Sequence, residues 1–194
     1  LNMILPAGKI PEDLGVTFIT AEAVVALAQA YETKTAAFEK LITIIGKQGA
    51  CYRVNATIGT PLKQIFSTFS IHINEQDKVI IGGPLTGYAT FSPDHPVQAD
   101  TDLIIVQDRD QIPELADNAC VNCGRCVDIC PAKVPVNLLV RFLEKNLYEE
   151  AADQYDLESC IECGLCAFVC KARIPLYQYI RLGKHELLAL RSDA

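Results

Sequence analysis

The chain has 194 residues, half of them hydrophobic, and its 17 basic and 24 acidic side chains give a formal net charge of -7. This composition is typical of a globular protein. The acidic balance excludes nucleic acid as an expected partner, because phosphate backbones attract basic surfaces. No run approaches the roughly 20 apolar residues of a membrane-spanning helix, so any membrane association is expected to be peripheral.

Residues 1–40 contain a segment rich in proline and glycine, ILPAGKIPEDLG, followed by the apolar run VTFI. The next segment, AEAVVALAQAY, has the alanines and leucine that favour a helix. This region holds too little apolar material for a core of its own. We therefore expect residues 1–40 to be the remnant of a larger domain that lies upstream.

Residues 41–107 contain four short runs with strand character: LITII, CYRVN, KVIIGG and DLIIVQD. Between the second and third run, IGTPLKQIFSTF predicts a helix with Thr60 as N-cap and Pro61 in the first helical position. Its apolar face would carry Leu62, Ile65, Phe66 and Phe69. Two strands, a helix and further strands are the order of a β-grasp domain, and the predicted fold class is α+β.

Two further details of this region lead to predictions. The Gly-rich segment GGPLTG, residues 82–87, lacks the Lys-Ser/Thr of a P-loop and the order GxGxxG, and so predicts a tight turn rather than a phosphate-binding loop. Cys51, in the second predicted strand, is interpreted as a small buried apolar residue. Residues 108–119, DRDQIPELADNA, predict a polar linker into a domain formed by residues 120–194.

Eight of the nine cysteines fall into two runs with the spacing C-x2-C-x2-C-x3-C, and the second run repeats the first at an offset of forty residues. Glycines, alanines, prolines and arginines coincide at the same offset, so the unit is a structural module used twice. The coinciding pairs are Gly124 and Gly164, Ala132 and Ala172, Pro135 and Pro175, and Arg141 and Arg181.

This spacing is typical of two-cluster ferredoxins, in which the fourth cysteine of each run ligates the cluster of the other run. The pattern predicts two [4Fe-4S] clusters. One is assigned to Cys120, Cys123, Cys126 and Cys170, and the other to Cys160, Cys163, Cys166 and Cys130. Structural zinc is the alternative, but it usually takes C-x2-C pairs separated by a longer loop. Thiolate ligands need a reducing compartment, which indicates the cytoplasm or the cytoplasmic side of a membrane.

Each cysteine run is followed by a predicted helix, so residues 120–194 are expected to form an α-helical domain. The first helix, in VPVNLLVRFLEKNL, would place on one face Leu139, Phe142, Leu143 and Leu147. The second, in IPLYQYIRLGKHELLAL, begins at Pro175 and would present Leu176, Tyr179, Ile180 and Leu187. Tyr177 and Tyr179 are interpreted as packing residues rather than redox relays. Pro131 follows the first cysteine run, but Lys171 stands at the equivalent position after the second. This lysine places a cation near a cluster.

The order of these motifs resembles the C subunit of the Rnf complex, a membrane-bound ferredoxin:NAD+ oxidoreductase. LPAGKIPEDLGV resembles the end of the flavin domain of that family, and KLITIIGKQGACYRVNATIGTPLKQIF with KVIIGGPLTG resembles its β-grasp domain, called SLBB. CVNCGRCVDICP and CIECGLCAFVC resemble its dicluster domain. The cobalamin reductases of propanediol-degrading microcompartments are similar to the same family.

The resemblance implies an electron-transfer subunit that lies peripherally on the cytoplasmic side of the cell membrane. Its expected partners are the other subunits of a membrane electron-transport complex and a ferredoxin or a flavin-bearing protein. The Gly-rich flavin and NADH loops of the family are absent from these 194 residues. This stretch of chain is therefore not expected to oxidise NADH by itself. Two alternatives remain: electron transfer to a corrinoid, and a non-redox interaction scaffold with structural clusters.

Overall fold

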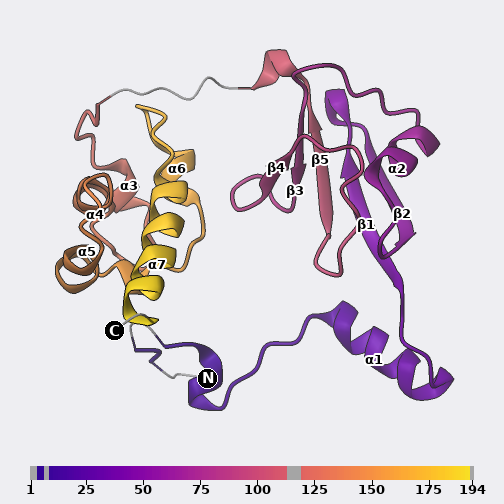
Figure 1. The fold of residues 1–194 in the computed structure, drawn as a ribbon, viewed down its shortest axis with the longest axis horizontal. Helices are drawn as coiled ribbons and strands as arrows, with labels where there is room; N and C mark the ends of the chain where they lie inside the picture. The colour runs from indigo at the N-terminus through magenta and orange to yellow at the C-terminus, as the bar shows by residue number, and fades with distance from the viewer. Residues whose placement is uncertain (1–3, 7–8, 113–118, 193–194) are drawn as a thin grey trace. The chain divides into compact units, whose positions relative to one another are not determined.

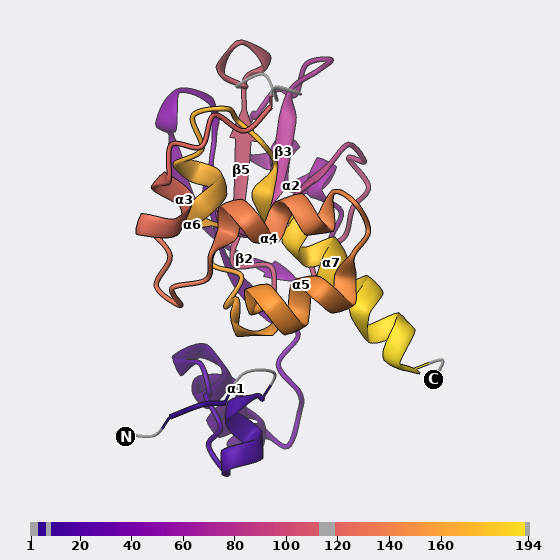
Figure 2. The ribbon, with the colours of Figure 1, turned by 90° about the vertical axis from the view of Figure 1, so that its left-hand side faces the viewer.

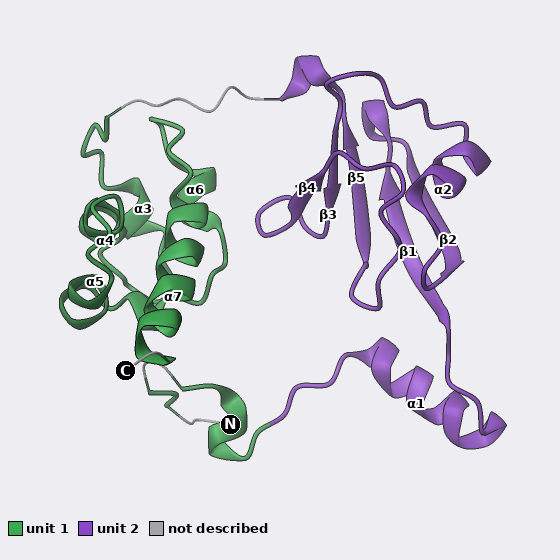
Figure 3. Ribbon diagram, in the orientation of Figure 1, with its two compact units in different colours: residues 1–16, 114–194 green, residues 17–113 purple. Residues whose placement is uncertain are grey.

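The computed structural model describes residues 4–6, 9–112 and 119–192 (Figure 1). The chain divides into two compact units, one formed by residues 17–113 and the other by residues 114–194 together with 1–16 (Figure 3). The first unit contains the sheet and the second contains the cysteine runs. The α+β class predicted from the sequence is confirmed. The predicted linker, residues 108–119, lies partly outside the described residues.

The sheet unit has five strands in the order β2-β1-β5-β3-β4. β1 (Glu39–Ile45) pairs antiparallel with β2 (Cys51–Thr57) and parallel with β5 (Leu103–Gln107), and β3 (Lys78–Ile81) pairs antiparallel with β5 and with β4 (Tyr88–Thr90). Four of the strands coincide with the predicted runs, whereas β4 was not predicted. Its three residues are not buried, and so they carry no alternation of apolar and polar side chains.

Alternation along the central strands places the core on one face of this sheet. β1, β3 and β5 alternate buried with less buried positions, and α2 (Leu62–Thr68) packs its apolar side chains against the buried set. The shared core contains Ile42, Ile44, Leu62, Ile65, Phe66, Val79, Ile81, Ile104 and Val106. The predicted apolar face of the helix is therefore confirmed, with Phe69 packed against the same core.

Two predictions about the sheet unit are wrong. Pro61, not Thr60, is the N-cap of α2, because Pro61 is extended and pairs with Pro96 as an isolated bridge, which delays the helix by one residue. Cys51 is exposed rather than buried, because it begins β2, an edge strand in which only Ala56 is buried.

The helix α1 (Ala21–Thr33) also belongs to the sheet unit and confirms the helix predicted there. The Thr20 side chain caps it by accepting a hydrogen bond from the backbone N–H of Ala23 at 3.2 Å. The largely buried Lys40 of β1 pairs with Glu22 of α1 at 2.5 Å and with Asp102 at 2.5 Å. Burial lowers the pKa of this ammonium, but its hydrogen bonds to the two carboxylates outweigh burial and leave the pKa raised.

Asp77 connects three loops of the sheet unit. Its buried carboxylate forms an ion pair with Lys47 and accepts hydrogen bonds from the backbone N–H groups of Asn74, at 2.6 Å, and Arg109, at 3.2 Å. The hydrogen bond from Lys47 is the main reason why the pKa of Asp77 is lowered. The carboxylate therefore holds the loop before β3 against the segment that follows β5.

The segment GGPLTG forms the predicted tight turn between β3 and β4, closed by a hydrogen bond from the N–H of Gly87 to the carbonyl of Gly83 at 2.8 Å. A Cβ atom at Gly87 would lie 2.5 Å from the Gly83 oxygen and 2.6 Å from the Ile81 oxygen. Both are backbone oxygens, one in the turn and one at the end of β3, so neither can move without disturbing the turn or the strand.

We expect Gly87→Ala to lower the free energy of unfolding of the sheet unit by about 1–3 kcal/mol, the usual cost of overpacking. Gly83→Ala is the matched control, because its Cβ would meet only Thr86 Oγ1 at 3.7 Å. For both variants, hydrogen exchange of the β3 and β5 amides in the full chain measures how far the protection of the sheet falls. Equal protection in the two variants would contradict the close approach.

In the second unit, the secondary structure itself repeats at an offset of forty residues. α3 (Arg125–Asp128) and α4 (Val136–Leu143) correspond to α6 (Leu165–Phe168) and the start of α7 (Leu176–Ser192), with α5 (Tyr148–Tyr155) inserted between the two copies (Figure 2). α4 and α5 both pack against α7 around one core. This core includes Val136, Leu139, Val140, Leu143, Ala151, Leu157, Leu176, Ile180 and Leu187.

The first predicted helix of this unit ends earlier than expected. α4 stops at Leu143 because Asn146 adopts a left-handed conformation, with φ of 60°, and Leu147 becomes the N-cap of α5. The second predicted helix is confirmed, with Leu176, Ile180 and Leu187 buried. Tyr177 is buried and Tyr179 packs against the core, as predicted.

Candidate iron-sulfur site

Two of the eight cysteines, Cys126 and Cys166, lie in the short helices α3 and α6, and the other six lie on the loops around them. Each run begins in a loop, passes through a glycine with positive φ, and enters a four-residue helix: Gly124 (φ 76°) is the N-cap of α3, and Gly164 (φ 74°) is the N-cap of α6. Asn122 and Glu162, two residues earlier, are both left-handed as well. This backbone turns each loop back on itself, and thus brings the first three cysteines of a run to one hollow.

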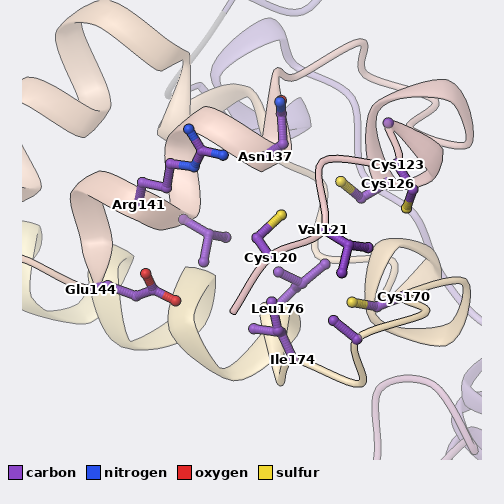
Figure 4. A pocket seen from close by; sticks show the side chains of 13 residues that line it. Cys120, Val121, Cys123, Cys126, Asn137, Arg141, Glu144, Cys170, Ile174 and Leu176 are labelled. Atoms are coloured by element: carbon purple, nitrogen blue, oxygen red, sulfur yellow. The ribbon is translucent and has the colours of Figure 1, made fainter. Parts of the chain in front are cut away.

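The structure brings the cysteines together in two sets, and each set joins both runs. Cys120, Cys123, Cys126 and Cys170 line one hollow (Figure 4). Cys130, Cys160, Cys163 and Cys166 line the other. The fourth cysteine of each run follows the short helix and faces the hollow of the opposite run. We call these hollows site 1 and site 2.

The two sites differ in how far water reaches their sulfurs. In site 1 Cys120 and Cys123 are exposed, Cys126 is buried and Cys170 is half-buried. In site 2 Cys130 is buried and the other three cysteines are half-buried. Apolar side chains complete both walls, with Val140, Ile174 and Leu176 in site 1 and Val136, Tyr177 and Ile180 in site 2. Site 1 is therefore the more open to solvent.

Burial disfavours the thiolate form of several of these cysteines. Loss of solvent raises the pKa of Cys126, raises that of Cys160, and raises that of Cys166 to about 11. Neighbouring cysteines add to the shift, and for Cys166 these include Cys126 of the other set. Iron stabilises thiolates, so ligation in a bound cluster would offset the cost of burying these sulfurs as anions.

The two sites are neighbours, because α3, which carries Cys126, contacts α6, which carries Cys166. Among the described residues, no three His, Cys, Asp or Glu side chains converge closely enough to hold a single metal ion. The sulfurs of each set are spread around the walls of a hollow, an arrangement that suits a multi-iron cluster.

The sequence analysis gave no role to the polar residues next to the cysteines, although it paired Arg141 with Arg181. In site 1 Arg141 of α4 donates a hydrogen bond to the Asn122 side-chain oxygen. In site 2 the ammonium of Lys184 in α7 donates to the carbonyl oxygen of Cys160 at 2.6 Å and lies 3.0 Å from Glu162 Oε1. The offset of forty residues would have found them, because it aligns Asn122 with Glu162 and Glu144 with Lys184.

Known proteins are similar to this chain, both in the region of the cysteine runs and over most of its length. Residues 119–174 match the family described as "4Fe-4S dicluster domain". The C subunit of the proton-translocating ferredoxin:NAD(+) oxidoreductase complex of Clostridium ljungdahlii is 33% identical over 185 residues, or 94% of this chain. The C subunit of the ion-translocating oxidoreductase complex of Edwardsiella ictaluri is 36% identical over 199 residues, or 100% of the chain.

A third relative, the C subunit of the Na(+)-translocating ferredoxin:NAD(+) oxidoreductase complex of Acetobacterium woodii, is 27% identical over 75% of the chain. The chain is a homologue of the C subunit of the Rnf complex. It spans 40%, 24% and 33% of the lengths of these three relatives, in the order given. This Rnf homologue contains a 4Fe-4S dicluster domain, and no helix among its described residues is long and apolar enough to cross a membrane.

Proposed function

We propose that this chain binds two [4Fe-4S] clusters and transfers electrons as part of an Rnf-type complex. The observation that carries the proposal is the sorting of eight cysteines into two hollows, each with three sulfurs from one run and the fourth from the other. This sorting has the crossed ligation of two-cluster ferredoxins. A single cluster or one zinc ion would leave one hollow and four cysteines without a use.

In this proposal site 1 takes its ligands from Cys120, Cys123, Cys126 and Cys170, and site 2 from Cys160, Cys163, Cys166 and Cys130. Four thiolates hold each cluster, which supplies a one-electron redox centre when bound. The residues of the chain hold the two sites side by side through α3 and α6 and surround them with apolar side chains. The exposure of Cys120 and Cys123 makes site 1 accessible to a redox partner.

The partners proposed for the chain follow from its homologues. The names of those proteins place them in ferredoxin:NAD(+) oxidoreductase complexes that translocate protons or sodium ions. We infer that this chain assembles with other subunits of such a complex, peripherally on the cytoplasmic side of the membrane, and exchanges electrons with a ferredoxin or a flavin-bearing protein. The β-grasp assignment of residues 41–107 remains a prediction, in which the sheet unit serves as a docking module.

The test is anaerobic assembly of the full chain with iron and sulfide. We expect about 8 iron and 8 sulfide per chain, and an absorbance that bleaches reversibly with dithionite, because two cubanes fill the two sites. Cys51→Ser is the matched control, since Cys51 lies in β2 outside both sets, and it should leave both values unchanged. About 4 iron per chain, bound zinc, or clusters that cannot be reduced would overturn the proposal.

A further inference from the structure

The two copies of the cysteine module carry opposite charges at one equivalent position. Counting forty residues on from Glu144 gives Lys184, while the neighbouring position keeps its charge, as Arg141 and Arg181. Glu144 follows the end of α4 and lines site 1, as Figure 4 shows. Lys184 lies on α7 beside the first loop of site 2. At this one position the duplication has therefore placed an anion in site 1 and a cation in site 2, whereas at the loop position Asn122 of site 1 is neutral and Glu162 of site 2 is negative.

Lys184 is held firmly in place. Only 23% of its side chain is exposed, and its ammonium bonds to the Cys160 carbonyl at 2.6 Å and pairs with Glu162 at 3.0 Å. Both partners lie in the loop that supplies Cys160 to site 2. In the same loop the N–H of Glu162 donates to Cys160 Sγ at 3.5 Å. Lys184 thus fixes a left-handed turn whose amide faces a ligand sulfur, and it adds a positive charge beside it.

The loop of site 1 keeps the arginine contact but not the lysine. Arg141 donates to the neutral Asn122 side chain, much as Arg181 lies 3.8 Å from Glu162 in site 2, whereas Glu144 is exposed at the rim of the hollow. The Cys120 sulfur lies 4.0 Å from Asn122 Oδ1, an oxygen that cannot donate a hydrogen bond. The loop of site 1 therefore lacks the lysine that supports the loop of site 2.

We propose that Glu144 and Lys184 shift the reduction potentials of the two sites in opposite directions, with Lys184 raising that of site 2 and Glu144 lowering that of site 1. This inference rests on the proposed function. A cluster that accepts one electron gains one negative charge, so a nearby cation favours the reduced form and an anion disfavours it. Lys184 acts as a positioning residue, because it contacts the loop that holds a ligand rather than the cluster.

Other features also influence site 1. Arg125 and Lys171 flank two of its cysteines, but both side chains lie in exposed positions where water and salt screen their charges. The greater exposure of Cys120 and Cys123 itself favours the reduced form, because water solvates added charge. The effects of single variants therefore test the proposal more directly than the absolute potentials do.

The experiment is a potentiometric titration of the full chain loaded with both clusters, in which electron paramagnetic resonance records the reduced form of each site separately. Lys184→Gln should reduce the equilibrium constant for reduction of site 2 about tenfold, which is about 59 mV for one electron, and leave site 1 unchanged. Glu144→Gln should shift site 1 the opposite way, by less, because Glu144 is exposed. Lys184→Arg keeps the charge and should restore most of the potential of site 2.

Arg191→Gln is the matched control. It removes a cation from the same helix, two turns beyond Lys184, where Arg191 pairs with Glu158 at 2.8 Å. Unchanged potentials in Lys184→Gln, or equal shifts of both sites in any variant, would overturn this inference and leave the proposed function intact. A chain that assembles no reducible cluster would instead overturn the proposed function itself.

Discussion

Cys170→Ala should abolish or degrade the cluster of site 1 and leave that of site 2 intact, although Cys170 belongs to the second run. The structure places Cys170 in the hollow of Cys120, Cys123 and Cys126. A cubane that loses one of its four thiolates keeps three bonds at most, and the remaining iron becomes exposed to loss. We expect the iron content to fall towards half of its value in the parent chain.

Matched variants make this result decisive. Cys170→Ala should leave the same paramagnetic signal as Cys120→Ala, because both remove a ligand of site 1. Cys130→Ala should instead match Cys160→Ala, since these two cysteines line site 2. Signals that group by run, with Cys170→Ala resembling Cys160→Ala, would show that each run ligates its own cluster and would refute the crossed assignment.

The sequence predicts most of the dicluster unit because its signals are local and occur twice. The spacing of the cysteines, the glycines that begin α3 and α6, and the apolar face of α7 all lie within short segments. The duplication also makes each copy a check on the other, as at Gly124 and Gly164, whose positive φ values differ by only 2°. The central strands are equally readable, because burial on one face imposes a period of two residues.

The remaining features depend on contacts that no short segment contains. Pro61 is the cap of α2 because of Pro96, which lies 35 residues further along the chain. The helix α5 is mostly polar, with only Ala151 buried, so its sequence gives little periodicity. The support of Cys160 by Lys184 joins residues 24 positions apart and emerges from sequence only when charged positions of the two copies are aligned.

Removing the clusters should unfold the helical unit and leave the sheet unit folded. Buried Cys126 and Cys130 belong to the helical core, and Cys160, Cys166 and Cys170 pack against it. The helices α3 and α6 have four residues each, far too few to form without tertiary support. Without iron, Cys126 remains as a buried thiol and Cys160 and Cys166 as half-buried thiols around two hollows. Ligation energy is thus folding energy for this unit.

The sheet unit has no comparable dependence, because its core around Ile44, Leu62 and Ile104 shares no residue with the helical core. Hydrogen exchange of the full chain, before and after anaerobic removal of iron with a chelator, measures the stability of the two units separately. Amides of α4 and α7 should lose protection while those of β1 and β5 keep theirs. Retained protection in α4 and α7 would mean that apolar packing alone holds the helices. Loss of protection in β1 and β5 as well would mean that the sheet depends on the helical unit for its stability.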